Sequence, residues 1–151
     1  MVGQGYSKEK YYTNLDQLIS AICRDALIEF QDFYLADQVT VKPFQLISGY
    51  DVPKTTLLGV TLADQMAADL SGNSTLSWFH RMTAGFNGII RPGERYEPKI
   101  EGLIEELDGY LRVHITACNS FGEKRDFVVS AEMSEPLYQA FHTRVKVYES
   151  Y

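Results

Sequence analysis

The sequence predicts an α+β fold in which helices pack on a mixed sheet of four to five strands that ends in an antiparallel meander. Three observations support this. Apolar residues recur at three- and four-residue spacing in three segments, as in amphipathic helices. In the last third of the chain they alternate with polar residues, as in strands with one buried face. The expected order is helix, strand, helix, strand, loop, three strands and helix, which suits helices covering one face of a sheet.

The length and composition fit one domain. The chain has 151 residues, of which 45% are hydrophobic and 13% aromatic, and this is enough to form one core. We therefore expect a polar N-terminal tail over residues 1–13 and a single α+β domain over residues 14–151.

The first expected helix covers residues 14–32. Asn14 and Gln17 resemble a capping box, in which the first side chain accepts hydrogen bonds from the first turn of the helix. The apolar face of this helix consists of Leu15, Leu18, Ile19, Ile22, Ala26 and Phe30. A helix with one such face is expected to lie on a sheet.

The next expected element is a strand at QVTVKPFQLI, residues 38–47. It is rich in β-branched and aromatic residues and places Val39 and Val41 on one face. Because Pro43 cannot donate a ladder hydrogen bond, the strand is expected to lie at an edge of the sheet or to bulge at that residue.

A second helix is expected over residues 56–70, capped by Thr55 or Thr56. Its apolar face consists of Leu58, Leu62, Ala63, Met66, Ala67 and Leu70. The run LSWFHRM, residues 76–82, then has the composition of a strand. The Gly- and Pro-rich stretch 83–98 shows no period and is expected to be a long loop.

The last third predicts three antiparallel strands and a helix. The strands are expected at Lys99–Leu107, Tyr110–Asn119 and Asp126–Met133, joined by turns at Asp108-Gly109 and around Gly122. Ser134 is expected to cap a final helix whose apolar side chains are Leu137, Phe141 and Val145.

The charge argues against two classes of partner. The formal net charge is −6 and the sequence pI is about 5.0, so neither a nucleic acid nor an anionic membrane is expected to bind. No apolar run approaches the roughly 20 residues needed to span a bilayer, so no transmembrane segment is expected. The start MVGQGYSKEKYYTN has no apolar segment behind its basic residues, and so it does not resemble a signal peptide.

Residue types with catalytic or metal-binding chemistry are scattered. His80, His114 and His142 stand apart, and Cys23 and Cys118 show no metal-ligand or redox spacing. The two cysteines are expected to be buried, and their pairing in a disulfide stays open. The carboxylates Glu105, Glu106 and Asp108 flank a tight turn and are expected to be solvated. We therefore expect no catalytic residue, no metal and no cofactor.

One local cluster has the composition of a partner site. Arg91, Arg95 and Lys99 alternate with Phe86 and Tyr96, a mixture of residues that protein interfaces favour. The predicted partner-binding residues are Phe86, Arg91, Arg95 and Tyr96.

Two segments resemble a known superfamily. QVTVKPFQLISGY, followed by a loop and LLGVTLADQMAADLS, resembles the strand, loop and helix that open the FlgO-like, CsgG-like and TolB amino-terminal domains of the bacterial envelope. KIEGLIEELDGYLRVHITACNSFGEKRDFVVSAEM is similar to their closing strands, so that the likeness covers about residues 36–133. Between these segments TAGFNGIIRPGERYEP stands where a FlgO-type chain usually has a short helix and a strand start.

The resemblance implies a non-enzymatic accessory domain of the periplasm or outer membrane. Such a domain would bind a protein partner during assembly of a bacterial surface structure such as a flagellum, and its export or lipoprotein leader is not visible in this sequence. Two alternatives remain. One is a self-assembling structural subunit, a homo-oligomer. The other is a small enzyme or ligand-binding domain whose site gathers His80, His114 and the acidic hairpin only in three dimensions.

Overall fold

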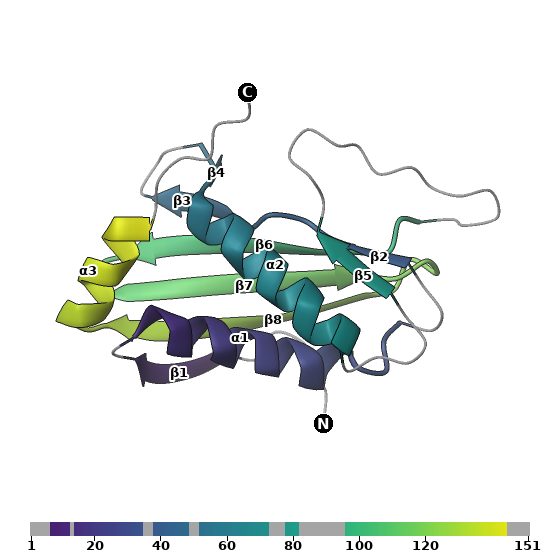
Figure 1. The fold of residues 1–151 in the computed structure, drawn as a ribbon, viewed down its shortest axis with the longest axis horizontal. Helices are drawn as coiled ribbons and strands as arrows, with labels where there is room; N and C mark the ends of the chain where they lie inside the picture. Colours follow the sequence, from purple (N-terminus) through teal and green to yellow (C-terminus); the bar gives the residue numbers. More distant parts are fainter. Residues whose placement is uncertain are drawn as a thin grey trace.

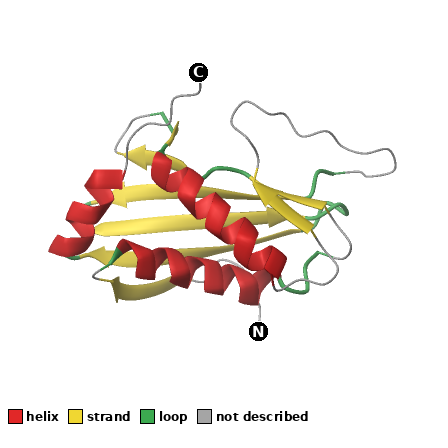
Figure 2. Cartoon of the chain, viewed as in Figure 1, coloured by secondary structure: helices red, strands yellow, loops and turns green. Residues whose placement is uncertain are grey.

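In the computed structural model, the three helices of the described residues cover one face of a mixed sheet (Figure 1). The structure describes residues 7–12, 14–34, 38–48, 52–72, 78–81 and 96–144. In chain order the elements are β1 (Ser7–Tyr12), α1 (Leu15–Phe30), β2 (Gln38–Val41), β3 (Gln45–Ser48), β4 (Lys54–Thr55), α2 (Leu57–Gly72), β5 (Trp78–Arg81), β6 (Lys99–Leu107), β7 (Tyr110–Cys118), β8 (Lys124–Met133) and α3 (Glu135–Arg144). Figure 2 shows α1, α2 and α3 on the same side of the strands.

The sheet confirms the predicted α+β class and its C-terminal meander. The main strand order is β1-β8-β7-β6-β2-β5, and β3 continues beside β6 with β4 on its outer side. β6, β7 and β8 are antiparallel neighbours, whereas β1, β2 and β3 pair in parallel with β8 or β6. Two parallel neighbours need a long connection between them. Accordingly, β1, β2 and β3 are each far in the sequence from the strand of the meander with which they pair.

Over the described residues the sheet has eight strands, because β1 and β4 were not expected and one expected strand is divided. Ser7–Tyr12, within the segment expected to be a polar tail, forms β1 and pairs with β8 from Ser7↔Val128 to Tyr12↔Met133. The strand expected at residues 38–47 is divided into β2 and β3, and the short β4 pairs with β3. The strand expected at residues 76–82 is confirmed as β5.

The helices begin at the predicted caps. Asn14 Oδ1 accepts hydrogen bonds from the backbone N–H groups of Asp16 and Gln17, at 2.8 and 3.3 Å. Of the two candidate caps of α2, the structure selects Thr56, whose Oγ1 accepts from the N–H of Gly59 at 3.1 Å. Every residue predicted on the apolar faces of α1 and α2 is buried.

The final helix α3 is also capped as predicted. Ser134 Oγ accepts from the N–H of Leu137 at 3.3 Å, and this satisfies one free donor of the first turn. Leu137 and Phe141 are fully buried. The third predicted apolar residue, Val145, lies outside the described residues.

The chain bulges around Pro43, between β2 and β3, as predicted, and neither of these strands lies at an edge of the sheet. Val41 pairs with Ile100 and Gln45 pairs with Leu103. Between these two pairs the segment that joins β2 to β3 has one residue more than β6. Because of this extra residue, each side chain after the bulge points to the side of the sheet opposite to the one it would otherwise face. Val41 before the bulge and Phe44 after it are therefore both fully buried beneath the helices.

Phe44 occupies space that two glycines leave free. A Cβ atom on Gly59 of α2 would lie 1.9 Å from the Phe44 carbonyl oxygen. A Cβ atom on Gly102 of β6 would lie 2.3 Å from Phe44 Cδ2. The Phe44 N–H also donates to the Gly59 carbonyl at 3.1 Å. Gly59 thus allows α2 to approach the bulge, and Gly102 leaves room for the Phe44 ring on β6.

Candidate functional site

Two large aromatic side chains are exposed at the end of the sheet where β7 passes into β8. Phe121 is 71% exposed and Tyr96 is 46% exposed. The ring of Tyr96 packs on Gly122, since a Cβ atom there would lie 2.5 Å from Tyr96 Cε2. Tyr96 and Phe121 therefore flank one turn, and we call this pair the aromatic end.

Asn119 fixes the turn that carries Phe121. The residue is buried, and its Oδ1 accepts from the backbone N–H groups of Phe121 and Glu123 at 3.1 and 3.0 Å. Its Nδ2 donates to Glu123 Oε1 at 2.9 Å and to the Phe33 carbonyl at 3.4 Å. Gly122 supplies the positive φ of 84° that the turn requires. The backbone beneath the exposed Phe121 ring is therefore held in place by hydrogen bonds.

Arg125 ties the same end of the sheet to α1. Its Nη1 donates to the Glu29 carbonyl at 2.7 Å and to Asp32 Oδ1 at 3.1 Å. Its guanidinium lies 4.8 Å from the centre of the Phe33 ring, within the range of a cation–π contact. A cation also suits the C-terminal end of a helix, where carbonyl groups lack partners.

The structure places one of the four predicted partner residues, Tyr96, at the aromatic end. Phe86, Arg91 and Arg95 lie outside the described residues. Phe121 and Asn119 were not predicted. A turn was expected at Gly122, but the pattern does not show which of its residues stays exposed. Asn119 just before a Gly-containing turn is the local signal that was available.

Lys99, the third cation of the predicted basic cluster, is bound within the sheet. Its Nζ lies 3.1 Å from Glu101 Oε1. Burial alone lowers the pKa of Lys99, but the hydrogen bond and charge of Glu101 outweigh it, and the net pKa is raised. This positive charge is therefore partly neutralised by its own strand neighbour.

The face of the sheet turned away from the three helices forms a second candidate surface, which we call the open face (Figure 1). Alternation along β6, β7 and β8 defines it, because the opposite set of residues is buried beneath the helices. Its members are Gln45, Ile47, Lys99, Glu101, Leu103, Glu105, Leu107, Tyr110, Arg112, His114, Thr116, Cys118, Lys124, Asp126, Val128, Ser130 and Glu132, of which Cys118 and Ser130 are buried.

His114 and Glu105 form a pair on the open face. His114 Nε2 lies 2.5 Å from Glu105 Oε1, and both side chains are about one-third exposed, at 38% and 30%. They line a shallow hollow of about 570 Å³ together with Leu103, Thr116 and four other residues. A histidine beside a carboxylate can act in proton transfer. Among the residues that line this hollow, Thr116 supplies a hydroxyl group.

The constellation expected for an enzyme does not gather at His114. Glu105 contacts His114, but its neighbour Glu106 points to the helix face and binds His142. His80 lies on β5, three strands from β7 in the sheet order. At roughly 4.8 Å between strands, the two backbones are about 14 Å apart.

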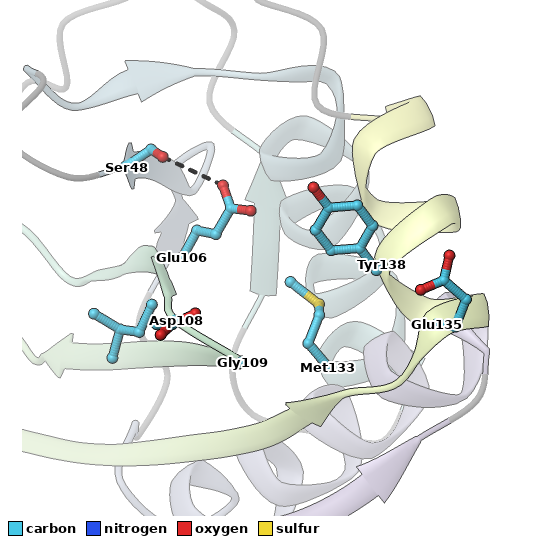
Figure 3. Close-up of a pocket in the computed structure, with 8 residues that line it drawn as sticks. Ser48, Glu106, Asp108, Gly109, Met133, Glu135 and Tyr138 are labelled. Carbon is cyan, nitrogen blue, oxygen red and sulfur yellow. Dashed lines mark hydrogen bonds between the residues drawn. The ribbon is translucent and has the colours of Figure 1, made fainter.

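A pocket of about 470 Å³ lies between α3 and the β6–β7 turn (Figure 3). Glu106 Oε1 accepts from Ser48 Oγ at 3.2 Å, and Glu106 Oε2 lies 2.8 Å from His142 Nε2. The pocket also contains Asp108 and Glu135, but within the described parts of the chain no group of three or more His, Cys, Asp or Glu could hold a metal. Asp108 is exposed as predicted, whereas Glu105 and Glu106 are half-buried and bonded.

The two cysteines are free, and both are buried as predicted. Cys23 lies on the buried face of α1, and Cys118 ends β7. Burial, together with the charge of Asp69, raises the pKa of Cys23 to about 12. The thiol of Cys23 is therefore protonated and unreactive near neutral pH.

No protein-family model, no curated protein and no solved structure matches this chain. Among the described helices, none is long and apolar enough to cross a membrane.

Proposed function

We propose that this chain is a non-enzymatic accessory domain that works by binding another protein at the aromatic end. One observation carries the proposal: the 71% exposed ring of Phe121 stands on a turn that the buried Asn119 holds with hydrogen bonds. Exposed aromatic rings dominate binding energy at many interfaces. A preordered turn also loses little conformational entropy when a partner binds.

The contacts around the rings of Tyr96 and Phe121 also favour a protein-binding site at the aromatic end. Tyr96 rests on Gly122, and Arg125 joins β8 to the end of α1 beside the turn. A surface braced in this way can present the two rings at a fixed spacing. The basic residues predicted beside Tyr96 would extend the contact, since Arg is enriched in interfaces.

We further propose a role in assembling a bacterial surface structure, in the periplasm or at the outer membrane. This part rests on the resemblance of residues 36–133 to FlgO-like and CsgG-like domains. Fractionation of cells that express the native gene tests it, because recovery of the protein in the cytoplasmic fraction alone would refute an envelope role.

The binding site is tested by comparing two alanine variants in pull-downs from envelope extract. Phe121→Ala removes the ring that is 71% exposed, and Tyr138→Ala removes another exposed ring, at 45%, on α3 at the other end of the sheet. We expect Phe121→Ala to lose a protein that the wild type and Tyr138→Ala both retain. With that protein purified, loss of a central aromatic contact should weaken binding by about thirtyfold. Equal recovery by Phe121→Ala and the wild type would exclude the aromatic end.

A further inference from the structure

We infer that the pocket between α3 and the β6–β7 turn binds an arginine side chain that a protein partner presents. The pocket has a volume of about 470 Å³, which lies within the usual range for a binding site. It lies at the end of the sheet opposite to the aromatic end (Figure 1), so this inference goes beyond the proposed function and is tested separately.

The charge of the pocket favours a cationic ligand. Asp108 of the turn and Glu135 of α3 lie on opposite sides of the pocket, and both are exposed (Figure 3). Among the described residues neither carboxylate has a cationic partner, since the bond printed on Glu135 comes from the neutral amide of Gln139 at 3.1 Å. None of the described residues that line the pocket is a lysine or arginine. A hollow lined by one sign of charge concentrates ions of the opposite sign.

The pocket also has apolar walls, which a simple ion would not use. Leu107, Met133 and the ring of Tyr138 form them. The Tyr138 ring is 45% exposed, and its centre lies 4.2 Å from the centre of the His142 ring. His142 Nε2 in turn lies 2.8 Å from Glu106 Oε2, so the position of the Tyr138 ring is supported from β6. A long cationic side chain could pack its methylene groups on these walls and its charge on the ring.

Two arguments select the guanidinium group of arginine. Within the described residues no group of His, Cys, Asp or Glu is arranged to hold a metal ion, and this favours an organic cation. A guanidinium group is planar and carries five N–H donors. It can therefore stack on the Tyr138 ring while it donates to Asp108 on one side and Glu135 on the other. The compact ammonium group of lysine cannot do both at once.

The test is an NMR titration of the full chain, near neutral pH and at low salt, with N-acetylarginine methylamide as the probe. We expect the backbone amide signals of Leu107–Gly109 and Glu135–Tyr138 to shift together, with a Kd of about 1 mM for this small probe. N-acetylcitrulline methylamide has nearly the same shape without the charge. It should bind at least about tenfold more weakly, because it forms neither the ion pairs nor the cation–π contact.

Substitutions in the pocket should weaken binding of the arginine probe in steps. Asp108→Asn and Glu135→Gln should each raise the Kd about threefold, and the double variant about tenfold. Tyr138→Leu keeps an apolar wall but removes the ring, and it should also raise the Kd about threefold. Glu132→Gln is the matched control, because it removes the same charge from an exposed residue outside the pocket lining. Glu132→Gln and Phe121→Ala should both leave the Kd unchanged.

Three outcomes would overturn the inference. The first is the absence of shifts at the pocket up to about 20 mM probe, far above the expected Kd. The second is equal binding of the arginine and citrulline probes. The third is an equal effect of Glu132→Gln and Asp108→Asn, which would mean that the probe responds to the overall negative charge. The same spectra show whether each variant is folded, so lost binding is not mistaken for lost structure.

Discussion

Glu105 and Glu106 are adjacent in β6, yet their carboxylates bind histidines on opposite faces of the sheet. Glu105 binds His114 on the open face, and Glu106 binds His142 of α3 on the helix face. The alternation of a β-strand sends neighbours to opposite sides, so one dipeptide serves two surfaces. The two glutamates of the hairpin therefore make two separate carboxylate–histidine contacts.

The two glutamates should differ in their contribution to stability. Glu106→Ala removes contacts to Ser48 of β3 and His142 of α3. Glu105→Ala removes a contact between half-exposed side chains of adjacent strands. We expect a loss of about 1–2 kcal/mol in the free energy of unfolding for Glu106→Ala and about 0.5 kcal/mol for Glu105→Ala. Hydrogen exchange should become faster in α3 for Glu106→Ala alone, and unchanged exchange there would contradict this role.

Two glycines of α2 should respond oppositely to alanine. At Gly59 the new Cβ would overlap the Phe44 carbonyl oxygen, whereas at Gly72 it meets nothing within 4 Å. Gly59→Ala is expected to lower the free energy of unfolding by about 3 kcal/mol, because helix and bulge must move apart. Gly72→Ala should be neutral or stabilising by up to about 0.5 kcal/mol. Urea titration checks both, and a Gly59→Ala variant as stable as the wild type would disprove the close approach.

The two hairpin glycines allow backbone strain to be separated from steric overlap. Gly109 and Gly122 have similar φ values of 77° and 84°, but only at Gly122 would a side chain meet the Tyr96 ring. Gly109→Ala should cost about 1 kcal/mol from its left-handed conformation. Gly122→Ala should cost about 2 kcal/mol or more, because the ring must also move. Equal losses in thermal unfolding would mean that Tyr96 does not rest on this turn.

Cys23 should make stability fall at alkaline pH. Its thiol ionises near pH 9.0 in the unfolded chain but only near 12 in the folded protein. Between these values the folded state holds the proton that the unfolded state releases, so stability decreases as pH rises. The expected loss from this one group is about 2 kcal/mol between pH 9 and 10.5. Urea midpoints of the wild type and Cys23→Ala over this range provide the measurement, since tyrosine and lysine titration is common to both. A parallel pH dependence of the two proteins would argue against a buried, protonated thiol.

Local periodicity was enough to predict most of the fold. Local sequence was enough to predict the buried faces of α1 and α2, the cap at Asn14 and the bounds of β6. In each of these elements the apolar residues repeat with the period of the helix or strand. Non-local pairing was harder to predict. The run SKEKYY of β1 carries no apolar alternation, and it joins the sheet through its backbone beside β8.

The candidate sites were less predictable than the fold. Tyr96 stood out by composition, but the exposure of Phe121 depends on how the turn is held, and the pairing of His114 with Glu105 depends on strand register. Both are consequences of tertiary contacts. The predicted residues Phe86, Arg91 and Arg95 stay predictions, since they fall outside the described ranges.

The parallel pairing of β1 with β8 has a consequence for the order of folding. β6, β7 and β8 are joined by short turns, whereas β1, β2 and β3 must each find a partner strand that is synthesised much later. Distant contacts close slowly because a long loop must be ordered first. We therefore expect the hairpins of β6, β7 and β8 to form first and to nucleate the sheet. During synthesis, β1, β2 and β3 cannot pair until β6 and β8 have left the ribosome.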